Sequence, residues 1–135
     1  MPRLTSDALE MLYATATGNV ESLELAWHPG AAVCVVLASE GYPQKPITGQ
    51  AITGLDEAGQ MEGVFIYHAG TKQDPASGEL VTAGGRVLGV TALGEDLAQA
   101  RDRAYAAADQ IRFPGMQVRR DIAMSSAAAA ATRIS

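Results

Sequence analysis

Two contrasting patterns of apolar residues run along the chain. Residues 31–38, AAVCVVLA, form an unbroken apolar run rich in valine, which is typical of a β-strand buried on both faces. Residues 95–113 instead repeat their apolar positions at helical spacing, which predicts an amphipathic helix. Its stripe consists of Leu97, Ala100, Ala104, Tyr105, Ala108 and Ile111. Pro114 and Gly115 are expected to end that helix.

Shorter segments with strand or turn character surround these two. Strands are predicted within VFIYHAGTK (64–72), ELVTAGG (79–85), RVLGVTALG (86–94) and MQVRRDIA (116–123). Glycine and proline mark loops at 39–50 and 73–78. The hairpin-like spacing around residues 64–92 predicts an α+β fold, an antiparallel sheet with a packed helix.

The N-terminal part has the signals of a separate helix. Thr5 or Ser6 can cap it, Gly18 can end it, and its apolar face comprises Leu9, Leu12, Tyr13 and Ala16. We therefore expect a leader over residues 1–30, a main domain over 31–123, and a low-complexity, alanine-rich tail over 124–135.

Composition excludes several classes of protein. The chain has 135 residues, enough for one domain, and its 47% hydrophobic and 19% charged residues indicate a globular protein. A net charge of −5 argues against a dedicated nucleic-acid binder. No apolar run approaches the roughly 20 residues of a membrane span, and no signal peptide is evident. One cysteine, Cys34, forbids an internal disulfide, so we predict a cytoplasmic protein.

The clearest candidate site is the sequence Gly84-Gly85-Arg86, which precedes an apolar strand. Glycines let the backbone approach a ligand closely, and a guanidinium can hold two phosphate oxygens at once. A tight turn or bulge with a surface arginine explains the same residues without a ligand. The spacing of a dinucleotide-binding loop is absent, so the motif alone leaves both interpretations open.

The other candidates have simple structural interpretations. His28 and His68 are the only histidines, and without metal-ligand spacing we expect no metal site. His68 is either a general base at a strand end or, more simply, a structural histidine. Cys34 is interpreted as a small core residue. The loop around Tyr42 either lines a site or merely connects strands.

Adjacent acidic residues also occur, at Asp56-Glu57 and at Glu95-Asp96. Neighbouring side chains point apart on a helix or a strand, so paired acid–base catalysis is not expected. We interpret the first pair as loop solvation and the second as favouring the first turn of the long helix.

Several blocks of the sequence, in order, resemble one family. The blocks are PRLTSDALEML, AAVCVVLASEGYP, ITGLDEAG, VFIYHAGTK and GELVTAGGRVLGVTALGEDLAQARDRAYAAADQIRFPGMQVRRDIA. Over residues 2–123 the chain closely resembles the C-terminal part of phosphoribosylamine–glycine ligase, also called glycinamide ribonucleotide synthetase. The resemblance implies the rudimentary single hybrid motif (barrel-sandwich hybrid) of ATP-grasp ligase C-terminal domains, with the leader similar to the last helical segment of the ATP-grasp region.

The family joins glycine to 5-phosphoribosylamine with ATP and Mg or Mn, in de novo purine biosynthesis. The resemblance implies that ATP and the metal bind in the ATP-grasp region, whose ligands are not among these residues, so we expect no catalysis by this chain alone. It also implies the ATP-grasp and N-terminal domains of the same enzyme as partners. After GYP the family usually continues with glycine, whereas Gln44 and Lys45 follow here.

The resemblance favours the anion interpretation of the candidate site. In related ATP-grasp ligases a basic residue of this domain reaches the phosphate of the ribosyl substrate, and Gly84, Gly85 and Arg86 resemble that element. Two alternatives are a module that binds ribose phosphates without chemistry and a structural docking piece. In the docking alternative, the apolar face of the leader is the adhesive part.

Overall fold

The structure of the chain is a computed structural model and describes residues 2–124. Of the predicted tail, only Met124 lies within this range. No helix of the described part is long and apolar enough to cross a membrane.

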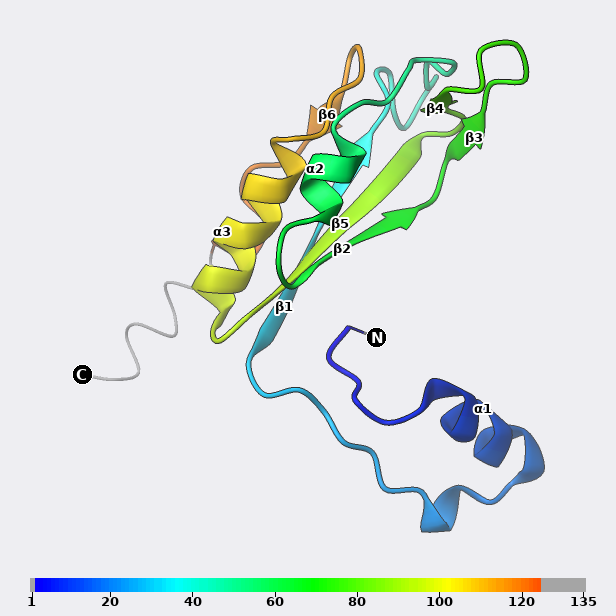
Figure 1. Cartoon of the computed structure of the whole chain (residues 1–135), viewed down its shortest axis with the longest axis vertical. Coiled ribbons are helices and arrows are strands. Elements are labelled where there is room, and N and C mark those ends of the chain that lie inside the picture. Colours follow the sequence, from blue (N-terminus) through cyan, green and yellow to red (C-terminus); the bar gives the residue numbers. More distant parts are fainter. Residues whose placement is uncertain (1, 125–135) are drawn as a thin grey trace.

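Four antiparallel strands form the main sheet, in the order β2-β5-β1-β6 (Figure 1). These strands are β2 (Val64–His68), β5 (Arg86–Gly94), β1 (Ala31–Ala38) and β6 (Gln117–Val118). β1 and β5 pair along their whole lengths, from Ala31 opposite Gly94 to Ala38 opposite Arg86. A second, two-stranded sheet joins β3 (Thr71–Gln73) to β4 (Leu80–Thr82). The predicted antiparallel sheet and the α+β class are confirmed.

One helix, α3 (Leu97–Ala108), covers one face of the main sheet (Figure 1). Asp96 caps it, because its carboxylate accepts a hydrogen bond from the Gln99 amide at 2.8 Å. The helix meets the sheet through four fully buried alanines, Ala100, Ala104, Ala107 and Ala108. Small side chains bring the helix so close that a Cβ on Gly94 would clash with the Ala100 backbone.

The predicted end of this helix is wrong. The helix ends at Ala108, well before Pro114, although Ile111 is buried as the pattern suggests. The cause is a backbone pairing of Arg112 with Thr53, whose two N–H···O bonds measure 2.9 and 3.0 Å. The chain therefore leaves the helix to satisfy a strand-like contact that the apolar spacing does not encode.

The opposite face of the sheet is open, which corrects two predictions about β1. Val33, Val35 and Leu37 are buried beneath α3, but Cys34 is exposed and Val36 is 43% exposed. Side chains of a strand alternate between its faces, and α3 covers only one of them. The strand is therefore not buried on both faces, and Cys34 is not a core residue.

A short helix, α2 (Leu55–Gly59), occupies the segment predicted as a loop. Asp56 and Glu57 lie in it, and Ala58 is fully buried. A five-residue helix with one apolar anchor has too little periodicity to be seen in a sequence.

The leader contains α1 (Ala8–Thr17) and a 3₁₀ turn, η1 (Val20–Ser22), and Figure 1 shows it apart from the main sheet. The cap of α1 is Asp7, not Thr5 or Ser6, with its carboxylate 2.7 Å from the Leu9 amide. The Ser6 hydroxyl instead accepts a hydrogen bond from the Ala26 amide at 2.7 Å, which ties the two ends of the leader together. Gly18 ends the helix with φ 74°, as predicted. The domain boundaries stay a prediction.

Candidate functional site

The candidate site begins with Gly84 and Gly85, which are fixed by packing. Neither glycine has a positive φ, so neither residue is required to form a left-handed turn. A Cβ on Gly84 would lie 3.2 Å from the Cα of Gly70, and a Cβ on Gly85 would clash with the Tyr42 ring. The two glycines therefore allow another segment of backbone and an aromatic ring to approach closely.

Ser39 holds this segment in place from the neighbouring strand end. Its side chain is buried, with 1% exposure, and its hydroxyl donates to the Gly84 carbonyl at 2.8 Å. Its backbone N–H donates to the Gly85 carbonyl, also at 2.8 Å. The connection between β4 and β5, which leads to Arg86, is thus held in place by two hydrogen bonds from Ser39.

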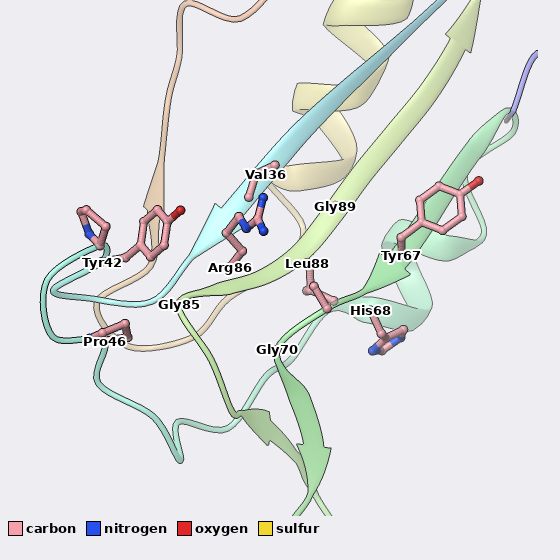
Figure 2. A pocket seen from close by; sticks show the side chains of 12 residues that line it. Val36, Tyr42, Pro46, Tyr67, His68, Gly70, Gly85, Arg86, Leu88 and Gly89 are labelled. Atoms are coloured by element: carbon pink, nitrogen blue, oxygen red, sulfur yellow. The ribbon is translucent and has the colours of Figure 1, made fainter.

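Arg86 is the first residue of β5 and lies beside a register shift. Leu37 pairs with Leu88 but Ala38 pairs with Arg86, which leaves Val87 as an extra residue. Such bulges re-aim the flanking side chains. In Figure 2 the Arg86 side chain lies next to Val36 on β1. The bulge expected by the ligand-free interpretation is present, and it turns the guanidinium to the open face.

Arg86 separates two shallow grooves on this face, and Val36 and Tyr42 also border both. The Tyr67 groove, of about 640 Å³, is further lined by Pro43, Pro46, Tyr67, His68, Ala69, Gly70, Gly85, Leu88 and Gly89. The Arg119 groove, of about 460 Å³, is further lined by Cys34, Ala38, Gln117, Val118, Arg119 and Ile122. Three glycines, Gly70, Gly85 and Gly89, line the first groove, and a residue without a side chain leaves its backbone open to a ligand.

The electrostatics of the two grooves favour an anion at Arg86. Neither lining contains an aspartate or a glutamate, although the chain carries a net charge of −5. Arg119 is paired with Asp121, with its Nε 2.9 Å from the carboxylate, and this hydrogen bond lowers the pKa of Asp121 and raises that of Arg119. Among residues 2–124 no ion pair or side-chain hydrogen bond engages the Arg86 guanidinium. Among the described residues that line the two grooves, Arg86 is therefore the cation whose charge no acidic side chain offsets.

The remaining candidates are separated from one another. His68 ends β2 and lines the Tyr67 groove, with its Nδ1 3.0 Å from the Thr71 hydroxyl. His28 lies in the leader, where Nδ1 contacts the Pro29 carbonyl at 2.5 Å. Within the described range, no group of three or more His, Cys, Asp or Glu side chains could hold a metal ion.

Sequence reasoning missed most of the groove walls. Tyr67 and Val36 were interpreted as members of apolar strands, and Cys34 as core. The sequence of the loop at Tyr42 fits either a site or a simple connection, and the structure places the Tyr42 ring against Gly85, next to Arg86. In β2, VFIYH, apolar and aromatic residues stand side by side without polar alternation, so the sequence carries no signal for the exposure of Phe65 and Tyr67.

Together the fold and the site define an α+β domain with two grooves on an open sheet face, separated by Arg86. The chain belongs to the family described as phosphoribosylglycinamide synthetase, C domain, whose model matches residues 32–125. The family predicted from the sequence blocks is therefore confirmed.

Three similar proteins carry the same name. The chain is 48% identical over 124 residues to the phosphoribosylamine–glycine ligase of Leifsonia xyli, covering 91% of this chain and 30% of that protein. With the Streptomyces coelicolor enzyme of the same name it shares 49% over 132 residues, covering 96% and 31%. The crystal structure of the Thermotoga maritima phosphoribosylamine–glycine ligase is 36% identical with a TM-score of 0.64, covering 82% and 27%. The chain thus spans less than a third of each of these proteins.

Proposed function

We propose that the chain is the C-terminal domain of a phosphoribosylamine–glycine ligase of the cytoplasm. The enzyme forms glycinamide ribonucleotide from 5-phosphoribosylamine, glycine and ATP in purine biosynthesis. The observation that carries the proposal is the family match over residues 32–125, together with relatives of that name at 48–49% identity. ATP and Mg or Mn belong, in this proposal, to the ATP-grasp region of the enzyme, and this chain contributes a wall of the active site without catalysing the reaction alone.

The role of Arg86 within this proposal is to contact the phosphate of the ribosyl substrate. Three features support it: the guanidinium is exposed, its grooves lack acidic residues, and its backbone is pinned by Ser39. A pinned backbone limits the conformations that binding must select. A hydrogen bond to a charged group contributes about 1.5–3 kcal/mol, which corresponds to roughly 10–150-fold in affinity.

A chimaera tests the assignment of the domain. Residues 31–123 replace the matching part of the Leifsonia xyli ligase, and ATP-dependent formation of glycinamide ribonucleotide is measured. We expect activity from the chimaera and none from the 135-residue chain alone. An inactive chimaera that is folded, or turnover by the isolated chain, would contradict the proposal.

The same chimaera tests Arg86. We expect Arg86→Ala to raise the KM for phosphoribosylamine by roughly 10–150-fold while the KM values for ATP and glycine stay unchanged. Arg86→Lys keeps the charge but not the paired donors, so its effect should be smaller. Arg101→Ala is the matched control, because Arg101 lies on α3, which covers the other face, and pairs with Asp102. An unchanged KM in Arg86→Ala refutes the phosphate contact and leaves the domain assignment intact.

The exposed face of α1 favours a second, structural role for the leader. Leu9, Leu12 and Tyr13 are 74%, 60% and 68% exposed, which is unusual for an amphipathic helix of a folded protein. We propose that this face docks on the ATP-grasp or N-terminal domain of the same enzyme. A chimaera that includes the leader should lose thermal stability on Leu12→Lys, and an unchanged melting temperature speaks against docking there.

A further inference from the structure

β2 forms one edge of the main sheet, and nothing in its sequence blocks the addition of another strand. Its one partner in the sheet is β5, and its five residues, VFIYH, contain no lysine, glutamate, aspartate or proline. Soluble proteins usually protect such an edge with charge, proline or a bulge. Phe65 and Tyr67 are instead 40% and 47% exposed on the open face of the sheet.

Two flanking hydrogen bonds determine which backbone groups of β2 face outward. The Leu93 N–H donates to the Gly63 carbonyl at 2.9 Å, and the Ala69 N–H donates to the Val87 carbonyl at 3.0 Å. Bonded and non-bonded residues alternate along an antiparallel ladder. Residues 63, 65, 67 and 69 therefore direct their backbone groups toward β5, and residues 64, 66 and 68 direct theirs away from it.

The outward groups comprise more carbonyls than free N–H groups. Ile66 and His68 present an N–H each, and Val64, Ile66 and His68 present a carbonyl each. The Val64 N–H is already used, because it donates to the Met61 carbonyl at 3.2 Å. A groove of about 510 Å³ is lined by all five residues of β2 and by Leu55, Asp56 and Gly59 of α2.

We propose that β2 is a self-association edge, on which β2 of a second copy of this chain adds in antiparallel orientation. The twofold axis passes beside Ile66, so that Ile66 N–H and C=O bond to Ile66 of the partner subunit in both directions. The His68 N–H of each copy then reaches the Val64 carbonyl of the other. This register uses every outward group except the His68 carbonyl and leaves the occupied Val64 amide undisturbed.

Side chains fit the same register. Phe65 lies opposite Tyr67 of the partner subunit, twice by symmetry, at the non-hydrogen-bonded positions where facing side chains approach most closely. Aromatic pairs across strands are among the stabilising ones, and no like charges face each other within the strand. A shift by one residue would set the outward groups of one copy against residues of the other whose groups are bonded to β5, and would break the aromatic pairs. A second copy thus matches this edge in both its backbone groups and its facing side chains. The proposal is independent of the ligase assignment.

Amide exchange in the 135-residue chain tests the proposal directly. As concentration rises from about 10 μM to about 1 mM, the range of weak interfaces, we expect the mass to rise from 14.0 kDa toward twice that value. The Ile66 and His68 amides should become slower to exchange with concentration, whereas those of Phe65 and Tyr67, bonded to β5, should not change. A chain that stays monomeric throughout overturns the proposal. So does association, for example through α1, that leaves the exchange rates of the Ile66 and His68 amides unchanged.

Three variants sharpen the test. His68→Pro removes an outward N–H that each monomer does not use, and should weaken association roughly 10-fold or more by deleting two of four hydrogen bonds. His68→Ala removes only the imidazole and should associate as the parent does. Val36→Lys places a charge on the open face away from the edge, and should also associate normally. Equal association of His68→Pro and His68→Ala, or dissociation by Val36→Lys, overturns the edge assignment. Amide exchange of the parent chain decides the matter if His68→Pro does not fold.

Discussion

Gly85 and Tyr42 should be energetically coupled. Because of this coupling, the effect of Gly85→Ala on the free energy of unfolding should depend on whether the Tyr42 ring is present. A Cβ at residue 85 would clash with Cδ2 of the Tyr42 ring and lie 2.9 Å from Cε2. Gly85→Ala should therefore destabilise the chain by about 1–3 kcal/mol, the usual cost of overpacking. The backbone of Gly85 is not in the left-handed region, so conformational strain adds nothing to this cost.

Removing the ring should remove the penalty. In a Tyr42→Ala background the close contact that remains is with Pro46 Cγ, at 3.2 Å, which a small shift can relieve. Replacing glycine by alanine at a compatible position stabilises a protein by about 0.4–1 kcal/mol, because the unfolded chain loses freedom. Gly85→Ala is thus expected to be neutral or stabilising in that background.

Urea unfolding of the four proteins of this cycle measures the coupling. With a slope of about 2 kcal/mol/M, in the middle of the range for a small protein, Gly85→Ala should lower the midpoint by about 0.5–1.5 M in the parent and leave it unchanged or higher in Tyr42→Ala. An unchanged slope shows that stability alone was altered. If the two substitutions are additive, the ring is not what requires glycine at 85, and the account of the double glycine fails.

Three further outcomes are expected from the packing and the charges. Ala104→Leu should cost about 1–3 kcal/mol by forcing α3 away from the sheet, whereas exposed Ala106→Leu should stay within about 0.5 kcal/mol in the same urea titration. The hydrogen bond from the Ala76 amide, at 2.8 Å, is the largest cause lowering the pKa of Asp74, so its contribution is present at neutral pH and is lost as pH falls through that lowered pKa. An acid titration followed at the Ala76 amide by NMR should give a midpoint below that of an ordinary aspartate, and a midpoint at or above it contradicts the turn. Exposed Cys34 should react with a thiol reagent in the folded chain, and labelling only after unfolding would place it in the core after all.

The sequence was informative for long elements whose residues are determined by local apolar spacing and turn residues. The strand Arg86–Gly94 and the antiparallel sheet were predictable from apolar runs and turn residues. The end of α3 was not, because Arg112 pairs with Thr53, a residue 59 positions away. The cap of α1 was misassigned for a similar reason, since Ser6 bonds to Ala26 across the leader.

The candidate site also has a part that the sequence predicts and a part that only the coordinates reveal. Arg86 and its two glycines stand out in the sequence, because glycine pairs before a strand are uncommon and a guanidinium suits anions. The partners of those glycines, Gly70 and Tyr42, come from other loops and cannot be assigned without coordinates. Whether Arg86 contacts a phosphate stays a prediction.

The sequence by itself determined the family, the α+β class, the apolar segments that form the main strands and the position of Arg86 after two glycines. These follow from local apolar spacing, turn residues and the agreement of several blocks in order. The tertiary structure decided which sheet face is covered, and hence that Cys34, Val36 and Tyr67 are exposed beside Arg86. It also decided that β2 is an edge. Burial and edge position depend on what packs against a strand, and that is set by contacts between residues far apart in the chain.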